Sequence, residues 1–474
     1  MSDVLLLNPP EVLSDLPPLG LLYVAAVLEK NDYDVNLIDC SIEKKSWDEL
    51  KDIVKNEQPK IVGITATTPG IGKTAKTAQT VKEVNPKIKV VLGGPHATIL
   101  PSECLKNKNI DFVIRGEGEF AFLNLVRYIL RDKKIGLRKI QNLSFKLDGT
   151  IVHNPQSMRI EDLDALPWPA RHFVPIKKYP GVVLPRKHPE TQVMATRGCP
   201  FNCTFCSSKN VFGSTIRFRD SVKVVNEIEY LVKTYKIKTI NFYDDGLNYN
   251  PKWTIKMCDE IIERGLNDKM EWKAQVRVNK PFVTEELLRK MKEAGCWLLC
   301  WGIESGDPQI LKNIRKAITL DEARRAIKMC SYVGIRSLGY FMAGNQGESI
   351  ETVERTIRFC VELGNLGLDY PQLTLAVPYP GTELYEMCRK NNWLKAKTWD
   401  GYENDKRSVI VQMPDLPDEF LEKAISIFYK RFYFRPSYLL RQISKIRKKD
   451  DFILLKIGAK YLKNAISKRV PIAG

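Results

Sequence analysis

The first 115 residues alternate short apolar runs with longer segments in which apolar residues recur at helical spacing. This alternation is typical of βα units that build a parallel sheet. It predicts helices such as residues 20–30 and 47–56, and five strands, at residues 4–8, 34–39, 60–66, 89–93 and 111–115. We therefore expect an α/β fold that begins with a doubly wound parallel sheet over residues 1–150.

A proline-rich stretch then predicts a linker over residues 151–190. From residue 191 a second alternating series begins, and its six strand candidates are residues 192–196, 239–243, 271–276, 297–303, 337–342 and 372–377. Six such units predict a partial (β/α)6 barrel of the TIM type over residues 191–387, behind a Rossmann-like first domain. The remaining residues, 388–474, are expected to form a basic, aromatic helical region.

Three cysteines, Cys199, Cys203 and Cys206, follow the first strand of the second series with the spacing C-x3-C-x2-C. Thiolates favour zinc or iron–sulfur clusters, and a cubane held by three cysteines leaves one iron open. We therefore predict a [4Fe-4S] cluster with a vacant coordination position. A structural zinc site with His188 as the fourth ligand is the alternative, although His188 lacks knuckle-like spacing to the cysteines.

This loop, with Phe205 just before its last cysteine, resembles the cluster loop of the radical SAM superfamily. The resemblance implies that the open iron chelates S-adenosylmethionine (SAM), which an electron from the cluster cleaves to a hydrogen-abstracting 5'-deoxyadenosyl radical. A one-electron donor such as flavodoxin or ferredoxin is then expected. The resemblance also implies SAM contacts at the carboxyl ends of the strands, from Phe205, Asp244, Arg277, Glu304, Gly344 and Pro380.

The loops of the first series resemble the cobalamin-binding domain that precedes the barrel in one radical SAM subfamily, on the turns at residues 8–10, 93–96 and 115–119. The resemblance implies cobalamin contacts from Pro10, Thr65, Thr67, Gly93, Gly94, His96, Gly116 and Glu117. The D-x-H-x-x-G signature is absent, so we expect cobalt without a histidine from that signature and His96 as a loop-shaping residue. A domain that has lost cobalamin is the alternative.

Two further motifs have simpler interpretations. Residues 69–74 resemble a phosphate-binding loop, but Thr67 stands where the Walker A pattern needs glycine. Cys296 and Cys300 flank the fourth strand of the second series, and one of them could face the cavity. Because a free cysteine usually behaves as a small buried hydrophobe, we expect both to belong to the core.

The composition indicates where the chain works. Eleven cysteines without a signal peptide fit a reducing compartment, so we expect a cytoplasmic protein. Residues 418–474 carry fourteen Lys or Arg against five Asp or Glu, which is half of the net charge of +18. This tail is either a solvated helix face or a surface for an anionic partner. We leave peripheral membrane contact open and do not infer nucleic-acid binding.

The end of the chain, with the run Phe432–Pro436, resembles that of anaerobic magnesium-protoporphyrin cyclases and hopanoid-associated relatives. The expected function is therefore cobalamin-dependent C-methylation or oxidative cyclisation at an unactivated carbon of a large, apolar substrate, either a lipid or isoprenoid or a tetrapyrrole. One alternative is a tRNA-modifying radical SAM enzyme, although Cys40 and Cys104 alone do not supply the extra cluster cysteines expected of one. The other is a non-catalytic cobalamin-binding protein.

Overall fold

The computed structural model describes residues 2–131, 136–156, 159–182, 184–402 and 409–444. The chain divides into two compact units. The first unit contains residues 1–179 together with residues 207–213 and 398–403, and the second contains the rest. Most of the stretch expected to be a linker, residues 151–190, therefore belongs to the first unit.

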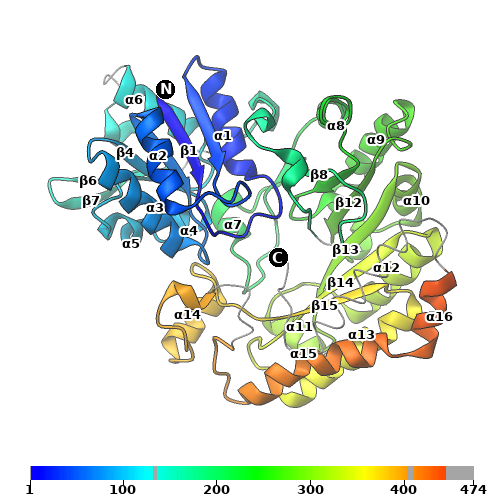
Figure 1. Ribbon diagram of the computed structural model, residues 1–474. Coiled ribbons are helices and arrows are strands. Elements are labelled where there is room, and N and C mark those ends of the chain that lie inside the picture. The colour runs from blue at the N-terminus through cyan, green and yellow to red at the C-terminus, as the bar shows by residue number, and fades with distance from the viewer. Residues whose placement is uncertain (1, 132–135, 157–158, 183, 403–408, 445–474) are drawn as a thin grey trace. The chain divides into compact units, whose positions relative to one another are not determined.

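The first unit is built on a seven-stranded sheet with the order β2-β1-β3-β4-β5-β6-β7 (Figure 1). The five expected strands are confirmed and pair in parallel, as β1 (Val4–Asn8), β2 (Val35–Asp39), β3 (Ile61–Thr65), β4 (Lys89–Gly93) and β5 (Phe112–Ile114). Two strands that we did not expect, β6 (Leu143–Leu147) and β7 (Thr150–His153), extend the sheet in antiparallel fashion. The order reverses between β1 and β3, which is where ligands of such sheets bind, at the carboxyl ends of the strands.

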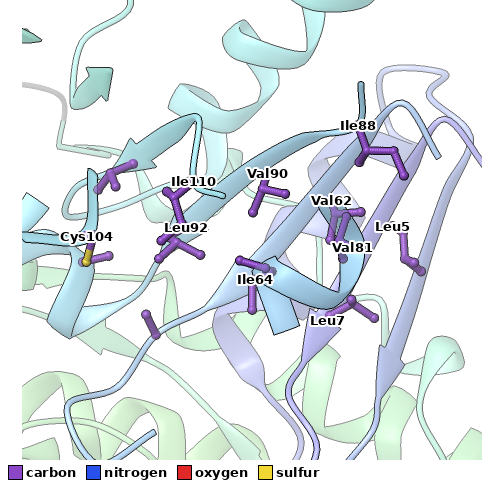
Figure 2. Packing of buried hydrophobic residues seen from close by; sticks show 14 of the residues in the cluster. Leu5, Leu7, Val62, Ile64, Val81, Ile88, Val90, Leu92, Cys104 and Ile110 are labelled. Atoms are coloured by element: carbon purple, nitrogen blue, oxygen red, sulfur yellow. The ribbon is translucent and has the colours of Figure 1, made fainter. Parts of the chain in front are cut away.

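Helices cover both faces of this sheet. On one face, buried residues of β1, β3 and β4 pack with Val81 and Cys104 from the covering helices (Figure 2). On the other face, α1 packs beside α6. The helices of this unit are α1 (Leu19–Glu29), α2 (Trp47–Glu57), α3 (Ile71–Val84), α4 (Pro95–Ile99), α5 (Pro101–Lys106), α6 (Glu119–Leu130) and α7 (Ser208–Phe212). Short 3-10 turns occur at η1 (Leu137–Lys139), η2 (Leu163–Ala165), η3 (Arg171–Phe173), η4 (Ile176–Lys178) and η7 (Trp399–Tyr402).

The second unit contains a six-stranded parallel sheet with the order β15-β14-β13-β12-β11-β8, so the expected partial barrel is confirmed. Its strands are β8 (Glu190–Val193), β11 (Thr239–Phe242), β12 (Glu271–Val276), β13 (Cys296–Glu304), β14 (Arg336–Ala343) and β15 (Tyr370–Leu375). A separate two-stranded ribbon pairs β9 (Thr196–Arg197) with β10 (Arg217–Phe218) on either side of the cysteine loop in the sequence.

Helices alternate with these strands, as the sequence predicts (Figure 1). They are α8 (Ser221–Tyr235), α9 (Pro251–Glu263), α10 (Glu285–Glu293), α11 (Pro308–Asn313), α12 (Leu320–Val333), α13 (Ile350–Leu366) and α14 (Glu383–Lys390), with 3-10 turns η5 (Leu247–Tyr249) and η6 (Lys280–Phe282). The chain ends its described part with α15 (Asp418–Tyr433) and α16 (Pro436–Ser444). Within the described residues, no helix is both long and apolar enough to cross a bilayer.

Candidate active site

The cysteine loop begins directly after β9, which follows β8 of the six-stranded sheet in the sequence. Gly198 has φ +100°, a left-handed conformation that glycine adopts without strain, and it turns the chain into the loop. Cys199, Cys203 and Cys206 are half-buried thiols that form no disulfide. The backbone of Thr204 fixes the loop, because its N–H bonds Ile314 O at 3.1 Å and its carbonyl accepts from Leu384 N at 3.0 Å. The three thiols are therefore held on a braced loop and remain accessible.

The donor set of the loop is three thiolates, a ligand type that favours zinc or iron–sulfur clusters. Within the described ranges, no three His, Cys, Asp or Glu side chains gather closely enough to hold one ion. A cubane spreads its thiolates over different irons and needs no such tight group. His188 precedes β8 whereas the cysteines follow β9, so the first strand and its extension separate His188 from them. The donor set therefore fits a cluster better than the zinc alternative.

Asp244 supports the segment that leads into this loop. The side chain is buried, and its Oδ1 accepts hydrogen bonds from Ala195 N at 3.0 Å and from the N–H and hydroxyl of Thr196. Burial raises the pKa of Asp244 to about 7. Its Oδ2 is buried without a hydrogen-bond partner among the described residues. Asp244 thus anchors the segment before the loop through Oδ1. A contact between its Oδ2 and SAM stays a prediction.

Arg277 and Glu304 are connected by a residue that the sequence analysis missed, Lys316. The ammonium of Lys316 lies 2.8 Å from Glu304 Oε1, and its backbone carbonyl accepts from the Arg277 guanidinium. All three side chains are almost fully buried. The guanidinium also stacks 3.4 Å from the centroid of Phe201 in the cysteine loop. This network brings the ends of β12 and β13 to the cysteine loop. Lys316 Nζ lies farther from the loop, 6.0 Å from the centroid of the Phe205 ring.

The backbone around this network is strained. Glu304 has φ +68°, and Arg315 and Ala317, which flank Lys316, have φ values of +51° and +54°. Non-glycine residues rarely adopt this conformation, and it persists where the surrounding structure imposes it, often at functional sites. No motif marks residues 315–317, and the only signal in the sequence was their position after the fourth strand.

The loop after β14 presents polar atoms without partners. Glu348 Oε2 accepts from the N–H groups of Gly344, at 2.5 Å, and Asn345, at 2.8 Å. Glu348 Oε1 and both side-chain polar atoms of Asn345 are buried and make no hydrogen bond among the described residues. Buried polar groups nearly always have a partner, so these atoms fit a polar ligand such as the amino acid end or ribose of SAM. The SAM contact of Gly344 stays a prediction, as does that of Pro380.

The neighbouring strand-end residues serve the fold. Ser305 Oγ and the N–H of Gly306 both bond Thr356 Oγ1, at 3.1 and 3.0 Å. After β15, Pro380 is buried in a loop in which Thr382 caps α14 through Tyr385 N. These contacts position α11, α13 and α14 around the strand ends.

Cys296 and Cys300 both lie in β13 and are almost fully buried. Burial raises the pKa of Cys300 to about 12 and that of Cys296 well above its usual value. Burial thus favours the neutral thiol, which packs as a small hydrophobe. The interpretation of both residues as core cysteines therefore agrees with their environment.

In the first unit, hydrogen bonds to a buried carboxylate fix the loop after β1. Asp39, at the end of β2, is fully buried, and its carboxylate accepts from Asn8 Nδ2 at 2.8 Å and from the Tyr179 hydroxyl at 2.8 Å. Ser14 also donates to Asp39, at 2.7 Å. Pro10 is buried in this loop. The loop is therefore fixed at the switch point of the sheet, where a ligand of this fold binds.

The loops after β3 and β4 lie against each other. Gly94 has φ +98°, and a Cβ there would approach Ala66 O to 2.8 Å, so only glycine fits. A Cβ on Gly93 would meet no atom within 4 Å, which leaves open space at the end of β4. Thr67 Oγ1 accepts from Gly70 N at 3.3 Å, and the Thr65 carbonyl accepts from Thr74 Oγ1 at 3.0 Å. The two glycines leave the backbone uncovered next to open space, so a large ligand such as cobalamin fits there.

Gly116 and Glu117, after β5, are engaged with the protein itself. Gly116 has φ +67°, and its N–H donates to Thr98 Oγ1 at 2.9 Å. Glu117 is buried, and its Oε2 accepts from Ile160 N at 2.8 Å. Glu117 therefore ties residue 160 to the sheet, and a direct contact with cobalamin stays a prediction.

The segment at residues 69–74, which resembles a phosphate-binding loop, is also engaged with the protein itself. Lys73, in the first turn of α3, donates to the carbonyl of Glu11 at 2.5 Å. A phosphate-binding lysine must instead reach the ligand.

Comparisons with known proteins match both units. Residues 10–126 match the B12 binding domain family, and residues 193–360 match the radical SAM superfamily. An uncharacterised methyltransferase of Pyrococcus horikoshii is 36% identical over 90% of each chain. The anaerobic magnesium-protoporphyrin IX monomethyl ester cyclase of Rubrivivax gelatinosus is 30% identical, over 97% of this chain and 81% of its own.

A solved structure extends these matches to the fold of most of the chain. The radical SAM methyltransferase TsrM from Kitasatospora setae, with cobalamin and a [4Fe-4S] cluster bound, has a TM-score of 0.72 at 17% identity, over 92% of this chain and 90% of its own. The expected resemblance to the cyclases and hopanoid-associated relatives is confirmed. The chain belongs to the B12-binding radical SAM enzymes, and its cofactors are a [4Fe-4S] cluster, SAM and cobalamin.

Proposed function

We propose that this enzyme methylates an unactivated carbon of a large substrate, with oxidative cyclisation as the second candidate. The observation that carries the proposal is the meeting of the cysteine loop, the Arg277–Lys316–Glu304 network and the unpartnered polar atoms of Asn345 and Glu348 around the strand ends of one sheet. The relative named as a methyltransferase is 36% identical and the relative named as a cyclase is 30% identical. Their names support methylation as the first candidate and cyclisation as the second.

When bound, the cluster with SAM supplies the hydrogen-abstracting radical, and cobalamin supplies a methyl group. The chain's own residues do the rest. Cys199, Cys203 and Cys206 would hold the cluster, and Phe201 with Arg277 braces their loop from the end of β12. Asn345 and Glu348 offer partners to polar groups of SAM.

The inner face of the sheet favours a substrate with some hydrogen-bonding groups. Side chains alternate between the two faces of β12, so Lys273 and Gln275 share one face. On that face Lys273 is fully buried in an ion pair with Glu190, whereas Gln275 is exposed. That face carries exposed Gln275 and half-exposed Tyr243 beside partly buried Tyr340 and Gln372, from neighbouring strands. A tetrapyrrole or a functionalised lipid suits such a surface better than a bare hydrocarbon.

The test uses SAM with a deuterated methyl group and anaerobically reconstituted enzyme, with a tetrapyrrole methyl ester and a polycyclic lipid as candidate substrates. Methylation places the label in the product and forms S-adenosylhomocysteine alongside 5'-deoxyadenosine, because cobalamin must be remethylated. Cyclisation forms 5'-deoxyadenosine with no label in the product. Absence of 5'-deoxyadenosine from the cluster-loaded enzyme would refute both candidates.

We also propose that the end of the chain contacts an anionic lipid surface. Phe434, Leu439, Leu440 and Ile443, at and beyond the end of α15, are 51–69% exposed. The following residues, 445–474, carry nine Lys or Arg against two Asp, which suits an acidic headgroup layer. A one-electron donor such as flavodoxin or ferredoxin remains the proposed protein partner.

A further inference from the structure

A short segment from the C-terminal region belongs to the first unit. Residues 398–402, which we call the strap, include η7 and the side chains of Trp399 and Tyr402. Trp399 lies edge-on against His96, with ring centroids 5.3 Å apart and an interplanar angle of 79°. Its indole N–H donates to Glu103 Oε1, and the ring centroids of Trp399 and Tyr402 are 5.1 Å apart.

The strap also touches the start of α3. A Cβ on Gly72 would lie 2.9 Å from Asp400 Oδ1, so glycine at this position lets the strap approach closely. Because α3 follows β3 and α4 follows β4, the strap crosses both loops at the carboxyl edge of the sheet. These are the loops that hold Thr67, Gly94 and His96, three of the residues expected to contact cobalamin.

His96 carries the second observation. Its side chain is fully buried, Nδ1 bonds Thr68 Oγ1 at 3.1 Å, and Nε2 has no hydrogen-bond partner among the described residues. Glu103 Oε1 is 3.8 Å from Nε2, too far for a hydrogen bond, and burial lowers the pKa of the imidazole. Nε2 is therefore buried beside Trp399 and Glu103 without a partner, and Gly93, three residues earlier in the same loop, faces open space.

We propose that the strap is a wall of the cobalamin-binding site. Trp399 covers the corrinoid at the β3 and β4 loops, and together with Glu103 it holds His96 with Nε2 turned toward the wall. In this orientation His96 does not ligate cobalt. The inference rests on the proposed function only in that cobalamin is a working cofactor of this chain.

The test is a spectrophotometric titration of the full-length, cluster-loaded protein with hydroxocobalamin, followed by measurement of cobalamin release. We expect Trp399→Ser to weaken binding about tenfold or more, since an indole face worth about 1.4 kcal/mol is lost. Trp399→Phe keeps an aromatic ring and should stay close to the natural protein. Trp168→Phe, a partly exposed tryptophan of the same unit outside the strap, is the matched control.

Two further readouts separate binding from folding. Glu103→Leu removes the acceptor of the indole N–H at a half-exposed position, so it should weaken cobalamin binding without endangering the fold. The cob(II)alamin EPR spectrum should show no nitrogen splitting from His96. Equal affinity and release rate in Trp399→Ser and the natural protein, or nitrogen splitting that His96→Gln removes, overturns the inference. Failure of the natural protein itself to bind cobalamin instead removes the cobalamin part of the proposed function, and the inference with it.

Discussion

At the scale of single residues, the three loop cysteines carry the chemistry. Replacing one thiolate of a three-ligand site leaves two, which is too few to hold a cubane. Cys203→Ala should therefore lose the visible absorption of the cluster, its iron and all SAM cleavage. These are measured by absorption spectroscopy, iron analysis and formation of 5'-deoxyadenosine.

Cys258→Ala is the control for that substitution, because Cys258 is a buried thiol of α9 far in sequence from the loop, and burial raises its pKa. It should keep cluster, iron and SAM cleavage. If Cys203→Ala keeps a full iron complement, the assignment of the cluster to this loop is wrong.

Glu348 gives the protein a pH dependence. Burial raises its pKa from 4.5 to about 7, against the lowering effect of hydrogen bonds from Asn345 and Gly344. A raised carboxyl pKa means that the folded state binds the proton more tightly, so stability falls as pH rises from about 4.5 to about 7. The full shift corresponds to about 3 kcal/mol.

Glu348→Gln removes this titration and still offers an oxygen to both N–H groups. Its melting temperature should therefore change less than that of the natural protein between about pH 5 and about pH 8. Glu351→Gln, at an exposed position of α13, should leave the pH profile unchanged. Parallel profiles for the natural protein and Glu348→Gln would falsify the raised pKa.

At the scale of elements, the end of β13 and the loop at Lys316 act together. Lys316→Met leaves the Glu304 carboxylate buried without its cation, a change that typically costs about 3–5 kcal/mol. It should lower the melting temperature and weaken SAM binding, measured by equilibrium dialysis. The double variant Glu304→Gln, Lys316→Met should recover stability but not SAM affinity, because the polar contacts near Phe205 stay absent.

The neighbouring ion pair between Arg315 and Glu383 is the comparison for this prediction. It joins the same loop to α14, with both side chains about half exposed. Exposed pairs contribute about 1 kcal/mol or less, so Arg315→Ala should change stability little. If Arg315→Ala lowered stability as much as Lys316→Met, the loss would come from disturbing the loop and not from leaving the buried Glu304 charge unpaired.

The elements also show what a sequence reveals. The expected parallel strands of both sheets were predictable to within two residues at each end, except the first strand of the second series. Its expected range, residues 192–196, ends three residues beyond β8, because Thr196 pairs in the separate β9–β10 ribbon. β7 escaped prediction because its four residues are exposed or half-exposed and show no apolar pattern. Lys316 escaped because it reaches Glu304 through a strained loop that carries no motif. The roles of Asp244 and Glu117 in bracing backbone were equally invisible, since either carboxylate could have faced a ligand.

At the scale of the whole molecule, the first unit contains the match to the B12 binding domain and the second most of the match to the radical SAM superfamily. Residues 398–403 return to the first unit although they follow the barrel in sequence. The order of domains in the sequence therefore does not describe the order of contacts. Removal of the C-terminal region should therefore weaken cobalamin binding as well as lower the stability of the second unit.

The exposed apolar residues of α16 give the last prediction, the contact with anionic lipid. In co-sedimentation with vesicles, the full chain should bind phosphatidylglycerol mixtures and not pure phosphatidylcholine, and salt should weaken binding by screening the charges of residues 445–474. The double variant Leu439→Glu, Leu440→Glu should abolish it, since the two side chains are 51% and 69% exposed. Tyr332→Glu, at an exposed aromatic residue of α12, should bind as the natural protein does. If the protein bound both vesicle types equally, or neither, the proposed lipid contact would be wrong and the alternative, a solvated helix face, would hold.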